Sequence, residues 1–167
     1  MEFTPLALIG FMGGGKSTVG RAVANELDVS FSDLDDQIEN ISGMRIPQII
    51  EQLGEDGLRH LESLALSNLA SFGGVAATSG SCVMIPRNRE ILEENFTVFF
   101  LDANFRELYP RIRGTGRPLL KSLSEMELSK LFELRRPLYQ SVADYTLDAT
   151  KPVSELVSEI LDKVIIF

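Results

Sequence analysis

The sequence has very few of the side chains that build disulfides or zinc sites. Its 167 residues include one cysteine, Cys82, and one histidine, His60. A lone cysteine cannot close an internal disulfide, and no cysteine or histidine cluster has the spacing of a structural zinc site. A reducing compartment suits such a chain, and we therefore predict a cytoplasmic protein.

Long apolar runs and an excess of basic residues are missing as well. No apolar stretch reaches the roughly 20 residues of a membrane-spanning helix, and the apolar run near the start of the chain follows no basic leader. The formal net charge is −8, whereas proteins that bind nucleic acids present basic surfaces to the phosphate backbone. We therefore expect neither a membrane nor a nucleic acid as a partner.

The residues that are present predict one folded domain that binds small anions. The chain is 44% apolar and 24% charged, which is typical of globular proteins, and its length suits a single domain. Against the acidic background, one segment gathers positive charge that can attract anions locally. It contains Arg106, Arg111, Arg113, Arg117, Arg135 and Arg136.

Strand-like and helix-like hydrophobic patterns alternate along the chain. This alternation predicts an α/β fold, a three-layer sandwich in which helices cover both faces of a five-stranded, mainly parallel sheet. The predicted strands are residues 6–10, 29–33, 75–78, 97–101 and 145–148. The predicted helices are residues 16–27, 35–41, 46–53, 55–69, 87–94, 103–111, 124–142 and 153–164.

A phosphate-binding motif follows the first predicted strand. Residues 10–17 read Gly-Phe-Met-Gly-Gly-Gly-Lys-Ser and match G-x-x-x-x-G-K-[ST] between a strand and a helix, where this P-loop pattern belongs. In such loops the backbone N–H groups surround the phosphates, the lysine reaches the β- and γ-phosphates, and the serine ligates Mg²⁺. We therefore predict a P-loop NTPase-type fold that binds ATP with Mg²⁺. The predicted ATP-binding residues here are Gly13, Gly14, Gly15, Lys16, Ser17 and Thr18.

Two aspartates follow the second predicted strand, at the edge where ligands gather in open α/β sheets. Alternation along a strand predicts that Asp33 and Asp35 point to the same side. One carboxylate is expected to hold the magnesium shell, and the other to bind an acceptor hydroxyl and help take its proton. The alternative is that both aspartates only cap a helix that begins near Asp36.

Taken in order, these motifs resemble the shikimate kinase family over residues 10–145. The family's Asp-x-Asp, Gly-Glu-x-x-Phe-Arg and Arg-x-Pro-Leu-Tyr elements correspond to residues 33–35, 54–59 and 135–139, with a leucine in place of the phenylalanine. The resemblance implies that Asp33 binds Mg²⁺ and that Asp35 binds the shikimate hydroxyls. It also implies Arg59 and Arg135 for the shikimate carboxylate, which a planar guanidinium can pair with through two hydrogen bonds.

The segment 113–121 resembles the lid of the same family. Two glycines and a proline among basic residues predict a mobile loop that closes over bound ligands. The resemblance implies that Arg117 approaches both the ATP phosphates and the substrate, so that Lys16, Asp35 and Arg117 form the predicted catalytic set. The family's adenine-flanking arginine has no match in register, and Arg111 and Arg113 are the nearest candidates.

One element departs from the family pattern. Three glycines that lie against shikimate in the family are replaced here by Ser79, Gly80 and Ser81, of which we predict that Gly80 and Ser81 bind substrate. Glycine at a strand end usually serves a positive φ or a close backbone approach, and a serine Cβ opposes both. Either the loop has shifted outward and binds shikimate weakly, or the hydroxyls bind a different acceptor.

The whole pattern predicts a monomeric shikimate kinase that transfers the γ-phosphoryl group of ATP to the shikimate 3-hydroxyl in aromatic amino-acid biosynthesis. Two alternatives stay open. Two arginines suit any carboxylate, so the acceptor could be another hydroxy acid such as gluconate. The serines at positions 79 and 81 could instead mark a nucleotide-binding regulatory module with impaired catalysis.

Overall fold

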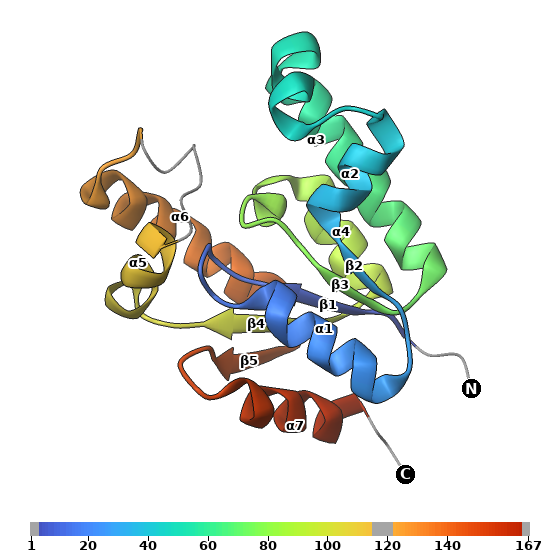
Figure 1. The fold of residues 1–167 in the computed structure, drawn as a ribbon, viewed down its shortest axis with the longest axis vertical. Helices are drawn as coiled ribbons and strands as arrows, with labels where there is room; N and C mark the ends of the chain where they lie inside the picture. The colour runs from blue at the N-terminus through green and yellow to red at the C-terminus, as the bar shows by residue number, and fades with distance from the viewer. Residues whose placement is uncertain (1–3, 115–121, 165–167) are drawn as a thin grey trace.

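A computed structural model describes residues 4–114 and 122–164 of the chain (Figure 1). The strands are β1 (Leu6–Ile9), β2 (Phe31–Asp33), β3 (Val75–Ala77), β4 (Thr97–Asp102) and β5 (Tyr145–Asp148). The helices are α1 (Lys16–Leu27), α2 (Leu34–Ser42), α3 (Ile46–Phe72), α4 (Pro86–Asn95), α5 (Phe105–Gly114), α6 (Glu125–Val142) and α7 (Val153–Val164), with a short 3₁₀ helix, η1, at Cys82–Met84.

The five strands form one sheet in the order β2-β3-β1-β4-β5, and every neighbouring pair is parallel. The predicted α/β class with a five-stranded parallel sheet is confirmed. Leu6 in β1 pairs with Val75 in β3 on one side and with Thr97 in β4 on the other. All four residues of β1 are buried, which explains why this central strand reads as a continuous apolar run.

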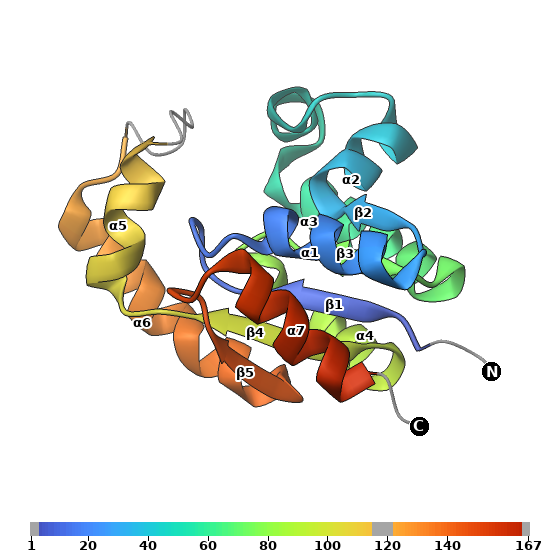
Figure 2. The same cartoon turned by 60° about the horizontal axis from the view of Figure 1, so that its bottom comes forward.

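Helices cover both faces of the sheet. Helices α1 and α7 contact each other on one face, while α3, α4 and α6 lie together on the other (Figures 1 and 2). Two parts project beyond these layers, α2 with the beginning of α3, and α5 with the beginning of α6 (Figure 1). The loop that follows β1 lies between the two projections in both views.

The apolar core lies between the sheet and its helices. Val98 to Leu101 in β4 are at most 1% exposed, and the ring of Phe100 packs on Tyr139 of α6 with centroids 5.1 Å apart. Within the described ranges, no helix is both long enough and apolar enough to span a membrane.

Most predicted boundaries agree with the observed elements to within a few residues. The predicted division of this region at Gly54 is confirmed, because α3 consists of two helical segments that meet at a kink at Gly54, where φ is 71° and ψ is −179°. Ser124 caps α6 as predicted, because its Oγ accepts a hydrogen bond of 3.1 Å from the Glu127 N–H. The short helix η1 was not predicted, since three residues carry no periodic signal.

A carboxylate fixes the start of the edge strand β5. The Asp144 Oδ2 accepts a 2.8 Å hydrogen bond from the N–H of buried Val98, and the Asp144 N–H donates to the Val98 carbonyl at 2.9 Å. The side chain therefore satisfies a backbone donor of β4 at a point where β5 has not yet begun.

We expect Asp144→Ala to lower the free energy of unfolding by about 1–3 kcal/mol, because the Val98 N–H loses its acceptor. The matched control is Asp144→Asn, which keeps an acceptor oxygen and should lose less than half as much. Urea unfolding of both variants measures the difference. Equal losses would show that the hydrogen bond is not the source of the stability.

Candidate active site

The P-loop between β1 and α1 has the backbone that the motif requires. Gly15, the N-cap of α1, is left-handed with φ at 83°, a conformation that costs a residue with a side chain on the order of 1 kcal/mol. At Gly10, a Cβ would lie only 2.8 Å from the Leu101 carbonyl oxygen of β4. Both positions therefore favour glycine, one for its φ and the other for its lack of a side chain.

Lys16 folds back over the loop that precedes it. Its Nζ donates to the carbonyl oxygens of Gly10 at 2.7 Å and Phe11 at 3.2 Å. The ammonium is thus held at the mouth of the loop, at the positive N-terminus of α1, where negative phosphate groups are favoured.

Asp33 joins the P-loop to the end of β2. Its Oδ2 accepts a 3.0 Å hydrogen bond from the Ser17 Oγ, and its Oδ1 accepts a 3.0 Å bond from the Asp35 N–H at the start of α2. Asp33 therefore caps the helix with one oxygen and faces the P-loop with the other. The helix-capping alternative and the P-loop interpretation both describe part of its role.

The predicted reason for the shared direction of Asp33 and Asp35 is wrong. Strand β2 ends at Asp33, and α2 begins at Leu34 rather than near Asp36. Asp35 consequently lies in the first turn of a helix, so alternation along a strand does not apply to it. Asp33 accepts a hydrogen bond from the backbone N–H of Asp35, and this N-cap begins α2 directly after β2.

Ser17 and Asp33 have the chemistry of a magnesium site on a nucleotide. A hydroxyl and one carboxylate supply two hard oxygen ligands, and Mg²⁺ in phosphoryl-transfer enzymes takes the rest from phosphates and water. Among the described residues, no group of three or more His, Cys, Asp or Glu side chains is arranged as a metal cage. The pair therefore fits Mg²⁺ that arrives with ATP.

The loop after β3 lies against both the P-loop and α6. A Cβ at Gly80 would be 3.4 Å from the Arg135 Nη1 and 3.7 Å from the backbone nitrogen of Met12. The Tyr139 hydroxyl donates to the Gly80 carbonyl at 2.5 Å, and burial raises the pKa of that hydroxyl. Gly80 and Arg135 are thus brought together beside the P-loop, as predicted from their family roles.

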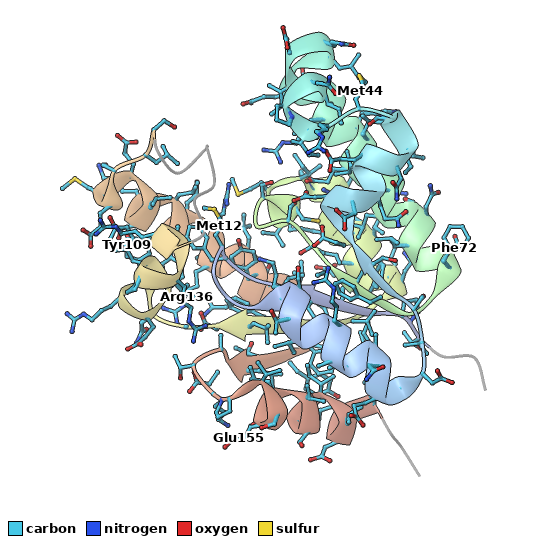
Figure 3. The ribbon with its side chains drawn as sticks, viewed as in Figure 1. Met12, Met44, Phe72, Tyr109, Arg136 and Glu155 are labelled. Atoms are coloured by element: carbon cyan, nitrogen blue, oxygen red, sulfur yellow. The ribbon has the colours of Figure 1, made fainter. Side chains whose placement is uncertain are left out.

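The two adjacent arginines of α6 point to different partners. Arg135 lies 5.8 Å from the ring centroid of Phe11, and burial lowers the pKa of its guanidinium. Arg136 instead forms a 2.7 Å ion pair with Asp102 at the end of β4 (Figure 3). That ion pair borders a hollow of about 420 Å³ lined by residues of the β4 and β5 ends, outside the P-loop. Only Arg135 faces the phosphate loop and Gly80.

Arg59 is held by a buried acid that sequence reasoning missed. The Arg59 Nη1 lies 3.7 Å from the Glu62 Oε1, one helical turn away on α3. Glu62 is only 2% exposed. A signal was available, because Glu62 stands one residue after Leu61 and three before Ala65, on the apolar stripe of the helix. A charged residue in such a stripe indicates a specific partner.

Neutral donors from two other elements complete the surroundings of Glu62. The Asn88 Nδ2 of α4 donates to the Oε1 at 3.0 Å, and the Ser79 Oγ donates to the Oε2 at 2.9 Å. Burial raises the pKa of the Glu62 carboxyl, and the hydrogen bonds together with the charges of Arg59 and Arg135 oppose that rise. Burial raises the pKa of the Cys82 thiol in η1, and the negative charge of Glu62 adds to that rise.

The serines at positions 79 and 81 do not strain the loop. Neither residue has a positive φ, and Gly80 is not left-handed either. Of the two reasons expected for glycine at this strand end, a positive φ does not apply to this chain, whereas Gly80 does lie close to Arg135 and to the backbone of Met12. The Ser79 side chain points to Glu62, while Ser81 precedes η1 with φ at −89° and ψ at −6°.

The arginines predicted for ATP fall into three groups. The Arg111 Nη1 donates to the carbonyls of Gly13 at 3.4 Å and Ala149 at 3.2 Å, so Arg111 links the P-loop to the loop after β5. Arg113 lies 5.8 Å from the ring centroid of Tyr109. Arg117 and most of the predicted lid lie outside the described residues. Thr18 is exposed in the first turn of α1.

Cys82 is buried completely, and burial raises the pKa of its thiol well above the usual range. The thiol is therefore kept neutral, and a thiolate nucleophile is disfavoured at this position. This agrees with the sequence-based expectation that Cys82 is a small packed residue.

A P-loop on the central strand of a parallel sheet, with Ser17 and Asp33 joined across its mouth, places this chain among the P-loop kinases. A family model described as shikimate kinase matches residues 12–165. The chain therefore belongs to the shikimate kinase family, as its motifs predicted.

Individual relatives agree with the family match. A shikimate kinase from Ralstonia nicotianae is 42% identical over 165 residues, covering 96% of this chain and 87% of the relative. The structure of a shikimate kinase from Acinetobacter baumannii in complex with shikimate superposes with a TM-score of 0.87 at 36% identity, covering 97% of this chain and 93% of that one. A gluconokinase from Sinorhizobium meliloti 1021, at 21% identity and a TM-score of 0.60, shares the fold alone and covers 96% of this chain and 91% of its own.

The raised pKa of Glu62 predicts a specific dependence of stability on pH. Burial raises the pKa of Glu62 above its usual value of 4.5, so the carboxyl binds its proton more tightly in the folded state than in the unfolded state. Its contribution to stability is therefore full below that value and is lost as the pH rises through the higher folded pKa. We expect the unfolding free energy of the parent to fall relative to that of Glu62→Gln between about pH 4 and pH 7.

Urea unfolding of both proteins across this pH range measures the effect, because glutamine does not titrate. A difference that is constant or grows with pH would contradict the raised pKa.

Proposed function

We propose that this chain is an ATP-dependent kinase that transfers the γ-phosphoryl group of ATP to the 3-hydroxyl of shikimate. One observation carries the proposal, namely that the P-loop, Gly80 and Arg135 lie together at the carboxyl edge of the sheet. A phosphate site and a carboxylate-binding guanidinium are thereby adjacent, as the transfer between ATP and a hydroxy acid requires. Family membership supports shikimate as that acid.

Catalysis in this proposal depends on positioning and electrostatics. Lys16 neutralises the β- and γ-phosphates, and Arg59 with Arg135 holds the substrate carboxylate. Burial is the main cause that lowers the pKa of Arg135, and the positive charge of Arg59 adds to it, as expected for two arginines of one anion site. Asp35, in the first turn of α2, positions the acceptor hydroxyl and helps take its proton. Gly80 and Ser81 contribute the loop that lies against the substrate.

Mg²⁺ is the proposed cofactor, with Ser17 and Asp33 as its protein ligands. The metal supplies charge neutralisation at the phosphates during transfer. The hydrogen bond between Ser17 and Asp33 supports this assignment, because it holds both oxygens at the mouth of the P-loop. Thr18 and the glycines at positions 13, 14 and 15 complete the proposed ATP contacts.

Several finer features belong to the same proposal. We expect a single-domain monomer that works in the cytoplasm. We also expect Arg111 rather than Arg113 to lie beside the nucleotide, because Arg111 contacts the Gly13 carbonyl. The catalytic role of Arg117 and the lid at residues 113–121 stay predictions. Intact Lys16, Ser17 and Asp33 geometry argues against a regulatory module without catalysis.

A coupled assay of ADP release tests the proposed activity. With ATP and Mg²⁺, we expect kcat/KM for shikimate to exceed that for gluconate and quinate by at least about 100-fold, because binding sites discriminate through positioned polar groups. Lys16→Met is the control and should lower kcat by about 100-fold or more.

A parent protein that releases ADP equally with all three acids would contradict shikimate as the substrate. Near-normal turnover by a folded Lys16→Met protein would contradict the role of the P-loop lysine.

The two aspartates are expected to respond differently to the same substitution. Asp33→Asn keeps a helix-capping side chain and should raise the Mg²⁺ concentration for half-maximal rate about tenfold or more, because a charged ligand is lost. Asp35→Asn should lower kcat with shikimate about 100-fold or more while ATP still binds, because the proton acceptor is lost. Titrations of each variant with Mg²⁺ and with shikimate measure the two effects. If both variants are rescued by Mg²⁺ alone, Asp35 does not act on the acceptor.

A further inference from the structure

Ser79 makes a contact that a glycine at this position could not make. Its Oγ donates a 2.9 Å hydrogen bond to the Oε2 of Glu62, on a different element of the fold. Ser79 is half-buried at the end of β3, whereas Glu62 is almost completely buried in α3. The substitution of serine for the family's glycine thus adds a donor to a buried acid.

The two oxygens of Glu62 have different partners. The Oε1 accepts from Asn88 at 3.0 Å and lies 3.7 Å from the Arg59 Nη1. The Oε2 accepts from Ser79. Asn88 is itself fixed, because its amide also donates to the Cys82 carbonyl at 3.0 Å and its Oδ1 accepts from Ser63 at 2.6 Å. Ser79 therefore completes the set of donors that determines how the carboxylate is turned.

We propose that Ser79 is a positioning residue for the shikimate site, because its hydroxyl holds Glu62 in the orientation in which the carboxylate fixes the guanidinium of Arg59. This rests on the proposed function, in which Arg59 binds the shikimate carboxylate. Ser79 acts through Glu62 and does not touch the substrate.

The physical reason is the cost of leaving a buried carboxylate oxygen without a donor. Without the Ser79 hydroxyl, the Oε2 loses a charge-assisted hydrogen bond inside the protein, where water compensates poorly. The carboxylate then turns toward other donors or takes up a proton, and burial already raises its pKa. Either response changes the partner of Arg59, whose guanidinium is about one-third exposed and has room to move.

The same contact argues against the idea that Ser79 binds a different acceptor. A hydroxyl has one proton to donate, and in this structure that proton is directed to Glu62. The Gly80 carbonyl accepts a hydrogen bond from Tyr139 at 2.5 Å, which holds the next residue of the loop on α6. These contacts support a positioning role for Ser79.

Steady-state kinetics of three variants at position 79 test the proposal. Ser79→Ala and Ser79→Gly remove the hydroxyl, while Ser79→Thr keeps it. We expect the first two to raise KM for shikimate about three- to tenfold, with KM for ATP and kcat each within about twofold of the parent. Ser79→Thr should restore at least half of the lost affinity. The matched control is Ser71→Ala in α3. The Ser71 hydroxyl also makes a hydrogen bond, to the Ser67 carbonyl, but it is exposed, so its loss should leave all kinetic constants unchanged.

A double-mutant cycle identifies the route of the effect. In an Arg59→Ala background, Ser79→Ala should change kcat/KM for shikimate by less than about twofold, because the group that it positions is gone. A full effect in that background would overturn the proposal, and so would a KM for shikimate at or below the parent value in Ser79→Gly. Ser79→Gly is informative because it restores the residue that the family pattern has at this position. Unfolding curves check that each variant is folded at the assay temperature.

Failure of this proposal and failure of the proposed function give different results. A parent with shikimate-dependent ADP release but no effect at position 79 rejects only the role of Ser79. A parent without shikimate-dependent ADP release rejects the proposed function and this inference with it.

Discussion

Parallel hydrogen bonding between the five strands determines where the chemistry of this protein can lie. A parallel strand must be followed by a crossover, so every strand of the sheet ends at the same edge. The ends of β1, β2 and β3 therefore deliver Lys16, Asp33 and Gly80 to one place, although they are far apart in the sequence. Because β1 is central, with β3 on one side and β4 on the other, the P-loop lies where the order of strands reverses.

Charge balance explains why an acidic protein can bind two anionic substrates. The net charge is −8, yet Lys16, Arg59 and Arg135 converge on one edge. Burial lowers the pKa of Arg135, the positive charge of Arg59 adds to this effect, and the negative charge of the buried Glu62 carboxylate opposes it. Burying the Glu62 carboxylate costs free energy. Hydrogen bonds from Ser79 and Asn88 and the positive charge of Arg59 offset part of this cost.

Much of the fold could be predicted because its signals are local. The helix Lys16–Leu27 and the strand Tyr145–Asp148 follow from the apolar periodicity of their own residues. The P-loop follows from a contiguous motif. The reason given for the direction of Asp35 was wrong, because the side-chain cap from Asp33 begins α2 at Leu34, so that Asp35 lies in a helix and strand alternation does not apply to it. Local competition between a cap and a strand is difficult to decide without coordinates.

The contacts of Glu62 could not be predicted, because they join three parts of the chain, namely α3, the loop after β3 and α4. Ser79 and Asn88 meet Glu62 across separations of 17 and 26 residues. The family motif singled out Arg135, but the ion-pair partner of its neighbour Arg136 has no signal in the sequence, since residues next to one another on a helix differ in direction by about 100°. Which of the two arginines pairs with Asp102 depends on the orientation of α6 about its axis, which the packing of Phe132 and Tyr139 in the core determines.

The buried thiol of Cys82 offers a chemical probe of the loop that follows β3. Cys82 comes directly after Ser81, and its side chain is completely buried. A thiol reagent can react with it only during an opening of this region, so that the labelling rate measures the free energy of the opening. Since no other cysteine occurs in the chain, the natural sequence carries a single chemical reporter of local unfolding, placed beside the site that binding is expected to rigidify.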